Sequence, residues 1–402
     1  MAEAAQQLAE ELDPTSEVMS LQMGPSHPAT HGTIKFNLKL DGEKILNCDV
    51  EIGYLHRGFE KMCEQRTWNH VVPYTDRLNY ASPLINNVAF VLAAEKLLEL
   101  QVPDRCQYIR MIMSEISRIT DHLTCLGMSA TEVGAISVGF YMLEARETLY
   151  DLVTAVTGAR LTVSYARVGG VTQDFPEGFA ERVRGAFADM RQILADCDKL
   201  LSKNRIFIER MSGVGVISKE DAISYGVTGP LLRATGVAYD VRKAQPYLFY
   251  DRMDFDVPTG TQGDNYDRFS VRFAEIKQSM RITEQALGQL PPGPVRVDDP
   301  HITLPAKKEV YDNIEGLMNH FKLVIEGVKI PRGEVYVPVE GANGELGFYL
   351  VSDGSGRPYR VRVRPPCFFG MAALGQMLKG CLVSDIITTF GMINMIGGEC
   401  DR

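Results

Sequence analysis

Helical hydrophobic periodicity over long stretches is the feature that most restricts the fold of this chain of 402 residues. Apolar residues recur every three or four positions, which is the pattern of an amphipathic helix with one face in a core. Six such segments occur, at 84–100, 105–126, 138–157, 176–203, 268–290 and 309–326. No internal repeat or Pro/Ser-rich linker separates them. The sequence therefore predicts one mainly helical body.

Strands are predicted near both ends of that body. Residues 33–40 alternate, with Ile34, Phe36 and Leu38 on one face, and Asp41-Gly42 then turns the chain into 45–52, which is a hairpin pattern. Near the other end a meander is predicted, with strands at 334–339, 345–351 and 359–364. We therefore expect a mainly helical α+β fold with small β-elements near both ends.

The predicted elements divide the chain into four parts. These are an acidic N-terminal tail at 1–20, a hairpin region at 21–66, the helical body at 67–330, and the meander with a C-terminal segment at 331–402. Within the body, residues 226–263 are rich in Gly, Pro, Tyr and Asp and lack periodicity. A loop that long in a compact chain is usually functional or packed by a neighbour, and we expect it to contact other subunits.

Charge and composition exclude several classes of protein. The net charge of −9 has the opposite sign to the basic surface that binds nucleic acid, so no nucleic-acid partner is expected. The first Lys or Arg is Lys35, which fits neither a secretory signal nor an Arg-rich transit peptide and favours a bacterial-type cytoplasm. No uninterrupted apolar run approaches the length of a spanning helix. The chain is therefore expected to be soluble or attached to a membrane through partners.

The cysteines argue against a metal centre held by this chain. None of the eight is three positions from another, whereas zinc and iron–sulfur sites are mostly built from closely spaced thiolate pairs. Gly-x-Ser-x-Gly, Gly-x-Gly-x-x-Gly and P-loop motifs are also missing from the sequence. Hydrolase, kinase and direct NAD-binding functions therefore lose their main support.

The segment 24–32, Gly-Pro-Ser-His-Pro-Ala-Thr-His-Gly, is the densest candidate site. It holds His27 and His31, and its prolines and glycines exclude a helix interior. A zinc-protease helix is excluded because the glutamate is missing and proline follows His27. From the residues alone, a turn whose histidines bind local backbone groups is the simpler interpretation.

Other clusters have equally simple alternatives. His56, Arg57, Glu60 and Lys61 fall within one turn and could form a solvated set of ion pairs. Tyr80 ends the segment Tyr-Thr-Asp-Arg-Leu-Asn-Tyr and could donate a proton, although tyrosine is common in cores and interfaces. A helical segment carries Asp121, His122 and Cys125, where packing is the more usual role.

Together, these motifs resemble the D-type subunit family of bacterial NADH:quinone oxidoreductase, respiratory complex I. The resemblance rests on the 24–32 segment, His56-Arg57-Gly58 and Asp76-Arg77-Leu78-Asn79-Tyr80, and it covers almost the whole chain beyond the acidic tail. Further matching segments, in the family's order, lie at 157–160, 167–171, 241–243, 263–268, 333–337, 352–360 and 401–402.

The resemblance implies a fold like the large subunit of nickel–iron hydrogenases. Those enzymes hold their metal with two Cys-x-x-Cys pairs, and both pairs are missing from this sequence. The resemblance therefore implies a former metal cavity that takes a quinone headgroup, at the boundary with a small iron–sulfur subunit that carries the terminal cluster. The quinone would be ubiquinone or menaquinone, and no cofactor would be bound by this chain alone.

Residue by residue, the resemblance places His31 and Tyr80 at the quinone oxygens and His27 on the same lip. Quinone reduction takes two electrons and two protons, and an imidazole and a phenol can both bind or protonate the ring oxygens. Glu132 stands where the family usually has Asp, which orients the quinone-facing histidine. Arg57 matches an arginine beside the partner's cluster, where a fixed positive charge favours the reduced state.

Thr162 departs from the family pattern, because many members have a histidine close to the cluster at this place. Its loss removes a group that could take up a proton as the cluster is reduced. We therefore expect a lower and less pH-dependent cluster potential, suited to a menaquinone, and a redox titration with a steep pH slope would overturn this expectation.

The resemblance also implies partners and a location. The partners are the small iron–sulfur subunit, other peripheral-arm subunits and a membrane-arm subunit that forms the quinone channel, with the chain peripheral on the cytoplasmic face of the bacterial inner membrane. Electrons would come from NADH through other subunits, and the whole complex would translocate protons. Two alternatives stay open: a structural scaffold subunit of a related ferredoxin- or deazaflavin-driven complex, and a free-standing hydrogenase-like enzyme, against which the missing Cys pairs weigh.

Overall fold

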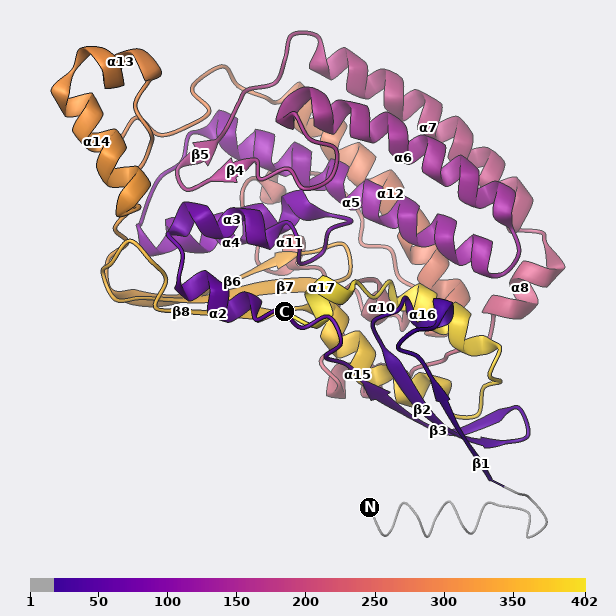
Figure 1. Cartoon of the computed structure of the whole chain (residues 1–402). Helices are drawn as coiled ribbons and strands as arrows, with labels where there is room; N and C mark the ends of the chain where they lie inside the picture. The colour runs from indigo at the N-terminus through magenta and orange to yellow at the C-terminus, as the bar shows by residue number, and fades with distance from the viewer. Residues whose placement is uncertain (1–17) are drawn as a thin grey trace.

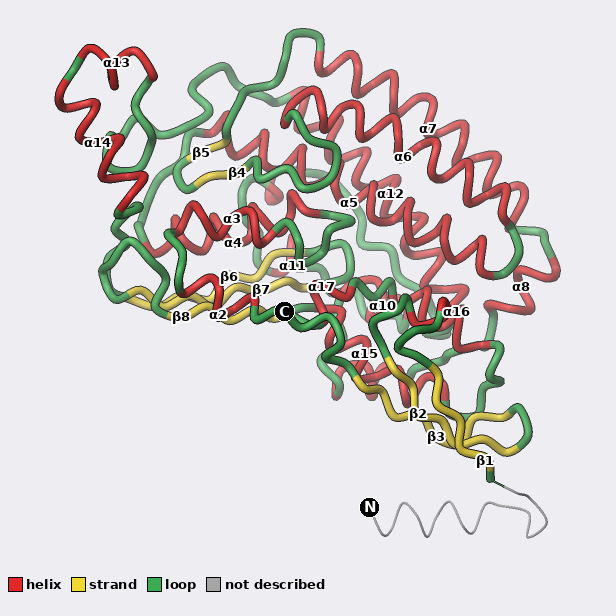
Figure 2. Tube along the Cα trace, in the orientation of Figure 1, coloured by secondary structure: helices red, strands yellow, loops and turns green. Residues whose placement is uncertain are grey.

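The computed structural model describes residues 18–402, and most of the acidic tail expected at 1–20 lies outside these residues. The described chain is a mainly helical α+β fold with sheets of two or three strands, as the periodicity predicts. Long helices run side by side in one half of the molecule, and the two larger sheets lie along its other side (Figures 1 and 2). The helices and strands fall into three groups, each with its own hydrophobic core.

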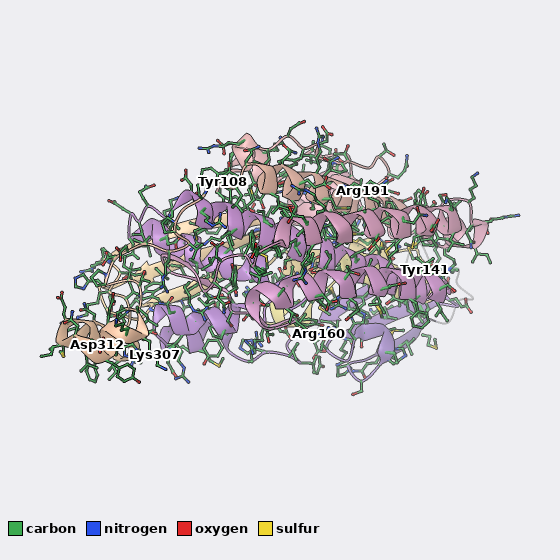
Figure 3. The ribbon with its side chains drawn as sticks, turned by 90° about the horizontal axis from the view of Figure 1, so that it is seen from above. Tyr108, Tyr141, Arg160, Arg191, Lys307 and Asp312 are labelled. Atoms are coloured by element: carbon green, nitrogen blue, oxygen red, sulfur yellow. The ribbon has the colours of Figure 1, made fainter. Side chains whose placement is uncertain are left out.

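The helical bundle forms the first group. Its long helices are α5 (Asp104–Glu132), α6 (Ile136–Thr157), α7 (Phe179–Leu201) and α12 (Asn265–Gly288). Helix α4 (Pro83–Leu97) lies beside them and contributes most of its buried residues to the third core. Helix α5 lies at the centre, because α4, α6, α12 and α16 (Asp385–Ile393) all pack against it. Viewed from above, α6 and α7 run along the length of the molecule, with Tyr141 toward one end of α6 (Figure 3). Helix α5 is consequently buried on most of its faces, including positions occupied by charged residues.

The N-terminal sheet confirms the predicted hairpin and adds a strand to it. Strands β2 (Lys35–Asp41) and β3 (Lys44–Glu51) pair antiparallel, and β1 (Met19–Met23) pairs with the free edge of β2. Strand β1 begins within the segment that the sequence assigns to the tail, because so short a strand at a sheet edge has little alternation. The inward face of the sheet packs on α15 (Pro366–Leu378).

The second larger sheet is the predicted meander. Strands β6 (Gly333–Glu340), β7 (Glu345–Ser352) and β8 (Arg360–Arg364) pair antiparallel, and α4 covers one face. The predicted helix at 309–326 is divided at Asn313 into α13 (Lys307–Asp312) and α14 (Ile314–Ile325), because the Asn313 side chain caps α14 through the backbone N–H of Glu315. Helices α13 and α14 project from the body (Figure 1).

Shorter elements connect these groups. They are η1 (Pro28–Thr30), α2 (Phe59–Glu64), α3 (Trp68–Thr75), β4 (Ala166–Arg167), β5 (Gly170–Val171), α8 (Arg205–Met211), α9 (Lys219–Ser224), α10 (Gly229–Ala234), α11 (Val241–Ala244), η2 (Tyr250–Arg252) and α17 (Gly397–Cys400). Residues 226–263, which are expected to contact other subunits, place the charged side chains of Arg233, Asp240 and Arg242 in the interior. Within residues 18–402, none of the helices is both long and apolar enough to span a membrane.

Candidate functional site

The 24–32 segment forms a tight lip that presents His31 to solvent. The His27 side chain caps η1, its Nδ1 accepting a hydrogen bond of 3.1 Å from the backbone N–H of Ala29. Gly24 has φ +87°, and a Cβ there would lie 2.3 Å from the carbonyl oxygen of Ile34, so glycine is required. His31 follows η1 in the left-handed conformation, and its side chain is 44% exposed. The turn interpretation therefore holds for His27, while His31 stays free for another partner.

His31 lies against the end of α5 and the last turn of α16. Its ring centroid is 4.7 Å from that of Phe390, and its Nε2 is 3.9 Å from Oε1 of Glu132. The latter separation is longer than a hydrogen bond, so the two side chains are close neighbours that are not hydrogen-bonded to each other. The other oxygen of Glu132 is buried without a hydrogen-bond partner among the described residues. The structure thus brings together the two residues that the sequence pairs, and Glu132 retains an unused acceptor.

Tyr80 lies on a short loop held firmly at both ends. On one side Ser82 donates a hydrogen bond of 2.9 Å to Asp121 of α5, and on the other Leu78 is fully buried. Tyr80 itself is 46% exposed. Partial burial raises its pKa, as do the nearby Asp121 and Cys367, while Arg146 opposes the shift. Tyr80 therefore keeps its phenolic proton at neutral pH and can donate a hydrogen bond.

Helix α17 lies where the two segments meet. A Cβ at Gly397 would lie 2.7 Å from the Leu55 side chain and 3.4 Å from Oγ1 of Thr33, two residues after His31. A Cβ at Gly398 would lie 2.2 Å from the carbonyl oxygen of Arg77, three residues before Tyr80. The residue that follows the lip and the residues that precede Tyr80 therefore lie against two consecutive glycines of α17, Thr33 against Gly397 and Arg77 against Gly398.

Helix α5 sets the distance between the two ends of the candidate site. Glu132, beside His31, and Asp121, beside the Tyr80 loop, are eleven positions apart on α5, or about 16 Å along the helix axis. Two partly open pockets lie elsewhere: one of about 470 Å³ is lined by residues of α4, α5 and β6, and another of about 570 Å³ by residues near α14. His31 and Tyr80 are both partly exposed in the isolated chain.

Arg57 belongs to the turn beside this surface. Backbone N–H groups of Gly53 and Leu55 donate to the Asp401 carboxylate at 3.0 and 2.8 Å, which fixes the turn to the end of the chain. The Arg57 guanidinium is exposed and donates a hydrogen bond of 2.8 Å to the carbonyl oxygen of Arg77. Arg57 therefore lies next to the Tyr80 loop. Thr162 lies in the loop after α6, partly buried.

A buried ionic network, which the sequence does not reveal, lies behind the site. Arg233 donates to Glu275 and Glu340 at 2.7 and 2.8 Å, and Nε2 of His122 is 2.9 Å from Glu275. The other members are Glu115, Arg118, Asp240, Arg242 and Arg272. Burial opposes ionisation of Glu115, but Arg118 and Arg242 more than compensate and lower its pKa to about 2. The only signal in the sequence is the occurrence of charged residues on every face of a predicted helix.

A second buried group joins the network to the end of the chain. Asn394 donates to Asp121 and to Asn343, the latter at 2.8 Å, and Asn343 donates to Sγ of Cys367 at 3.5 Å. The Cys367 thiol in turn donates to Oε2 of Glu399 at 2.9 Å. Sequence reasoning missed this group, although Glu399 is the first charged residue after the apolar run 386–398.

The sequence is similar to known proteins along nearly its whole length. It matches the family described as "Respiratory-chain NADH dehydrogenase, 49 Kd subunit" over residues 132–402. It is 56% identical to a D-type subunit of the NADH-quinone oxidoreductase of Sorangium cellulosum, over 98% of this chain and 97% of that protein. It is 54% identical to the corresponding D-type subunit of Myxococcus xanthus, over 96% and 92%. It is also 49% identical to that of Pelobacter propionicus, over 95% of each protein.

Proposed function

The chain belongs to the family of the 49 kDa subunit of the respiratory-chain NADH dehydrogenase, and we propose that it holds the quinone headgroup of an NADH:quinone oxidoreductase. In this proposal the quinone binds at the surface between His31 and Tyr80. The supporting observation is that the segments carrying these two residues lie against consecutive glycines of α17, one against Gly397 and the other against Gly398.

The donors at this surface fit the chemistry of a quinone. Negative charge develops on two ring oxygens during reduction, and preorganised donors at those oxygens stabilise it. Tyr80 retains its proton at neutral pH because its pKa is raised, so it can donate to one oxygen. His31 can bind the other oxygen through its imidazole, and Oε1 of Glu132 lies 3.9 Å from its Nε2.

The exposure of His31 and Tyr80 fits a site that other subunits complete. We propose that it is covered by a small iron–sulfur subunit, which supplies electrons from its cluster, and that Arg57 faces that cluster and His27 supports the lip. A membrane-arm subunit would deliver ubiquinone or menaquinone, with further peripheral-arm subunits linking the site to NADH and the chain on the cytoplasmic face of the inner membrane. Coupling to proton translocation belongs to the whole complex.

A scaffold subunit is the alternative, and the Tyr80→Phe variant separates the two functions. The quinone-site proposal predicts that the assembled complex loses at least about ten-fold in quinone reduction, because one proton donor is removed while the ring and its packing stay. Reduction of a water-soluble acceptor that does not use the quinone site should be unchanged. The matched control is Tyr311→Phe, an exposed tyrosine on the projecting α13. Unchanged quinone turnover in assembled Tyr80→Phe complex would favour the scaffold.

A further inference from the structure

Glu399 is a buried carboxyl group that takes no part in the quinone chemistry proposed for Tyr80, His31 and Glu132. It lies on α17, is 2% exposed, and accepts a hydrogen bond of 2.9 Å from the Cys367 thiol of α15. Burying a charged carboxylate without a cation in contact costs free energy. Such a group therefore tends to bind a proton and become neutral, unless neighbouring groups stabilise its charge.

Glu399 is adjacent in the chain to a residue that lies against the Tyr80 loop. Its neighbour Gly398 touches the backbone of Arg77 and Leu78, just before Tyr80. After Tyr80, the carbonyl oxygen of Ala81 accepts from Thr120 at 3.2 Å, and Ser82 donates to Asp121. The Tyr80 loop therefore lies across α17 and α5, directly beside the buried groups of both helices.

Hydrogen bonds continue from Glu399 to the same aspartate. Cys367 donates to Glu399 and accepts from Asn343, Asn343 donates to the carbonyl oxygen of Asn394 at 3.0 Å, and Asn394 donates to Asp121. Glu399, Cys367 and Asp121 are thus parts of one connected buried cluster. Charge that appears at Tyr80 acts on this cluster, because Asp121 and Cys367 lie near enough to Tyr80 to raise its pKa.

The groups around Glu399 allow it to change charge near neutral pH. Burial raises its pKa to about 7, Asp121 acts in the same direction, and the hydrogen bonds with Cys367 and the charge of Arg364 of β8 oppose the rise. Burial and Glu399 hold the pKa of the Cys367 thiol well above its usual value, and burial raises that of Cys400 to about 12. Both thiols therefore stay protonated near neutral pH, whereas Glu399 can gain or lose a proton there.

We propose that Glu399 is the charge-compensating carboxyl of the candidate quinone site, binding one proton when Tyr80 gives up its own. This role rests on the proposed function. In the balanced step, the O–H bond of Tyr80 breaks and an O–H bond forms on the quinone oxygen, while two electrons come from the donor subunits. One proton from water binds Glu399 and returns to water when Tyr80 recovers a proton from water. Glu399 is thus a positioning residue that acts through Tyr80.

The pH profile of quinone reduction by the assembled complex tests this role. The wild-type kcat is expected to show an inflection near pH 7, and Glu399→Gln should remove it while changing the KM for quinone less than two-fold. Glu326→Gln, an exposed glutamate paired with Lys329, should leave the inflection in place. A Glu399→Gln profile that keeps the wild-type inflection would overturn the role of Glu399.

Two variants of Cys367 give an independent test if Glu399→Gln fails to assemble. The thiol stabilises the charged carboxylate, so Cys367→Ala should move the inflection to higher pH, whereas Cys367→Ser keeps a donor and should shift it less. No difference between these two variants would count against the proposal. Tyr80→Phe separates the two hypotheses: if it abolishes quinone reduction while Glu399→Gln keeps the inflection, the quinone site stands and the role of Glu399 falls.

Discussion

Gly398 of α17 touches the backbone of Arg77 so closely that a Cβ at position 398 would lie 2.2 Å from the carbonyl oxygen of Arg77. Real Cβ atoms do not approach carbonyl oxygens to that distance, so any larger residue at 398 must push the Tyr80 loop away from α17. The contact between these two residues is therefore one of those that position the Tyr80 loop relative to the end of the chain.

Gly398→Ala should lower the turnover of quinone reduction strongly and the free energy of unfolding only moderately. We expect a loss of about ten-fold or more in turnover, because a displacement of about 1 Å at a reacting group is costly. The overpacking itself should cost about 1–3 kcal/mol. Turnover and the thermal unfolding midpoint of the purified complex measure the two effects.

The matched control is Gly185→Ala in α7, where the new methyl group would meet no atom within 4 Å. Replacing an exposed glycine within a helix by alanine should stabilise the chain by about 0.5–1 kcal/mol and leave turnover unchanged. If Gly398→Ala retains wild-type turnover, the contact with Arg77 does not position Tyr80.

Periodicity in the sequence predicted the long helices and both larger sheets because these elements have one apolar and one polar face. It failed for the C-terminal helices α15 and α16. Residues such as Ile386 and Phe390 are buried together with Thr388 and Thr389, so polar and apolar positions do not alternate. A helix buried on all sides has no polar face from which a period could be recognised.

Only part of the candidate site could be predicted from the sequence. His31, Tyr80 and Glu132 came from the resemblance to a family, while the contact between α17 and the Tyr80 loop joins residues more than 300 positions apart. Glu399 and Cys367 carried no local motif, because their chemistry comes from mutual contact and burial. Such properties depend on the tertiary fold and leave no pattern in the order of the residues.

His31 and Glu132 should show energetic coupling in quinone reduction. Their nitrogen and oxygen are 3.9 Å apart, and the second oxygen of Glu132 is buried without a partner among the described residues. Removing either group should therefore change what the other contributes. In a double-mutant cycle with His31→Ala and Glu132→Gln, we expect the losses of transition-state stabilisation, calculated as RT ln of the kcat/KM ratios, to be non-additive by at least about 0.5 kcal/mol.

An unrelated glutamate provides the comparison for this cycle. His31→Ala combined with Glu326→Gln should be additive, because Glu326 follows the last turn of α14 and pairs with Lys329, not with the lip. Additivity of His31→Ala with Glu132→Gln would mean that the carboxyl group of Glu132 does not act through the imidazole.

Arg233 should be among the most sensitive positions for stability. Its guanidinium is fully buried and binds the carboxylates of Glu275 and Glu340 at 2.7 and 2.8 Å. Arg233→Met keeps a long side chain but leaves both carboxylates without their shared cation, and breaking a buried ion pair in this way typically costs about 3–5 kcal/mol.

The exposed pair of Arg205 and Glu209 is the control, because Arg205→Met should cost less than about 1 kcal/mol. The midpoint of thermal unfolding of the complex measures both, and equal midpoints for the two variants would show that neighbouring residues compensate for the loss of Arg233.

Removing the charge of Arg233 should also change the electrostatics of the candidate quinone site through the buried network. Glu275, which loses its cation, binds His122, and Arg272 faces His122 at 3.4 Å. Arg272 in turn donates to Asn343 at 3.1 Å, next to Cys367. Because charges at short range in a buried cluster influence one another strongly, a complex that survives Arg233→Met should show a changed pH profile of quinone reduction as well as a lower unfolding midpoint. A wild-type profile in that variant would mean that the network stabilises the fold without acting on the site.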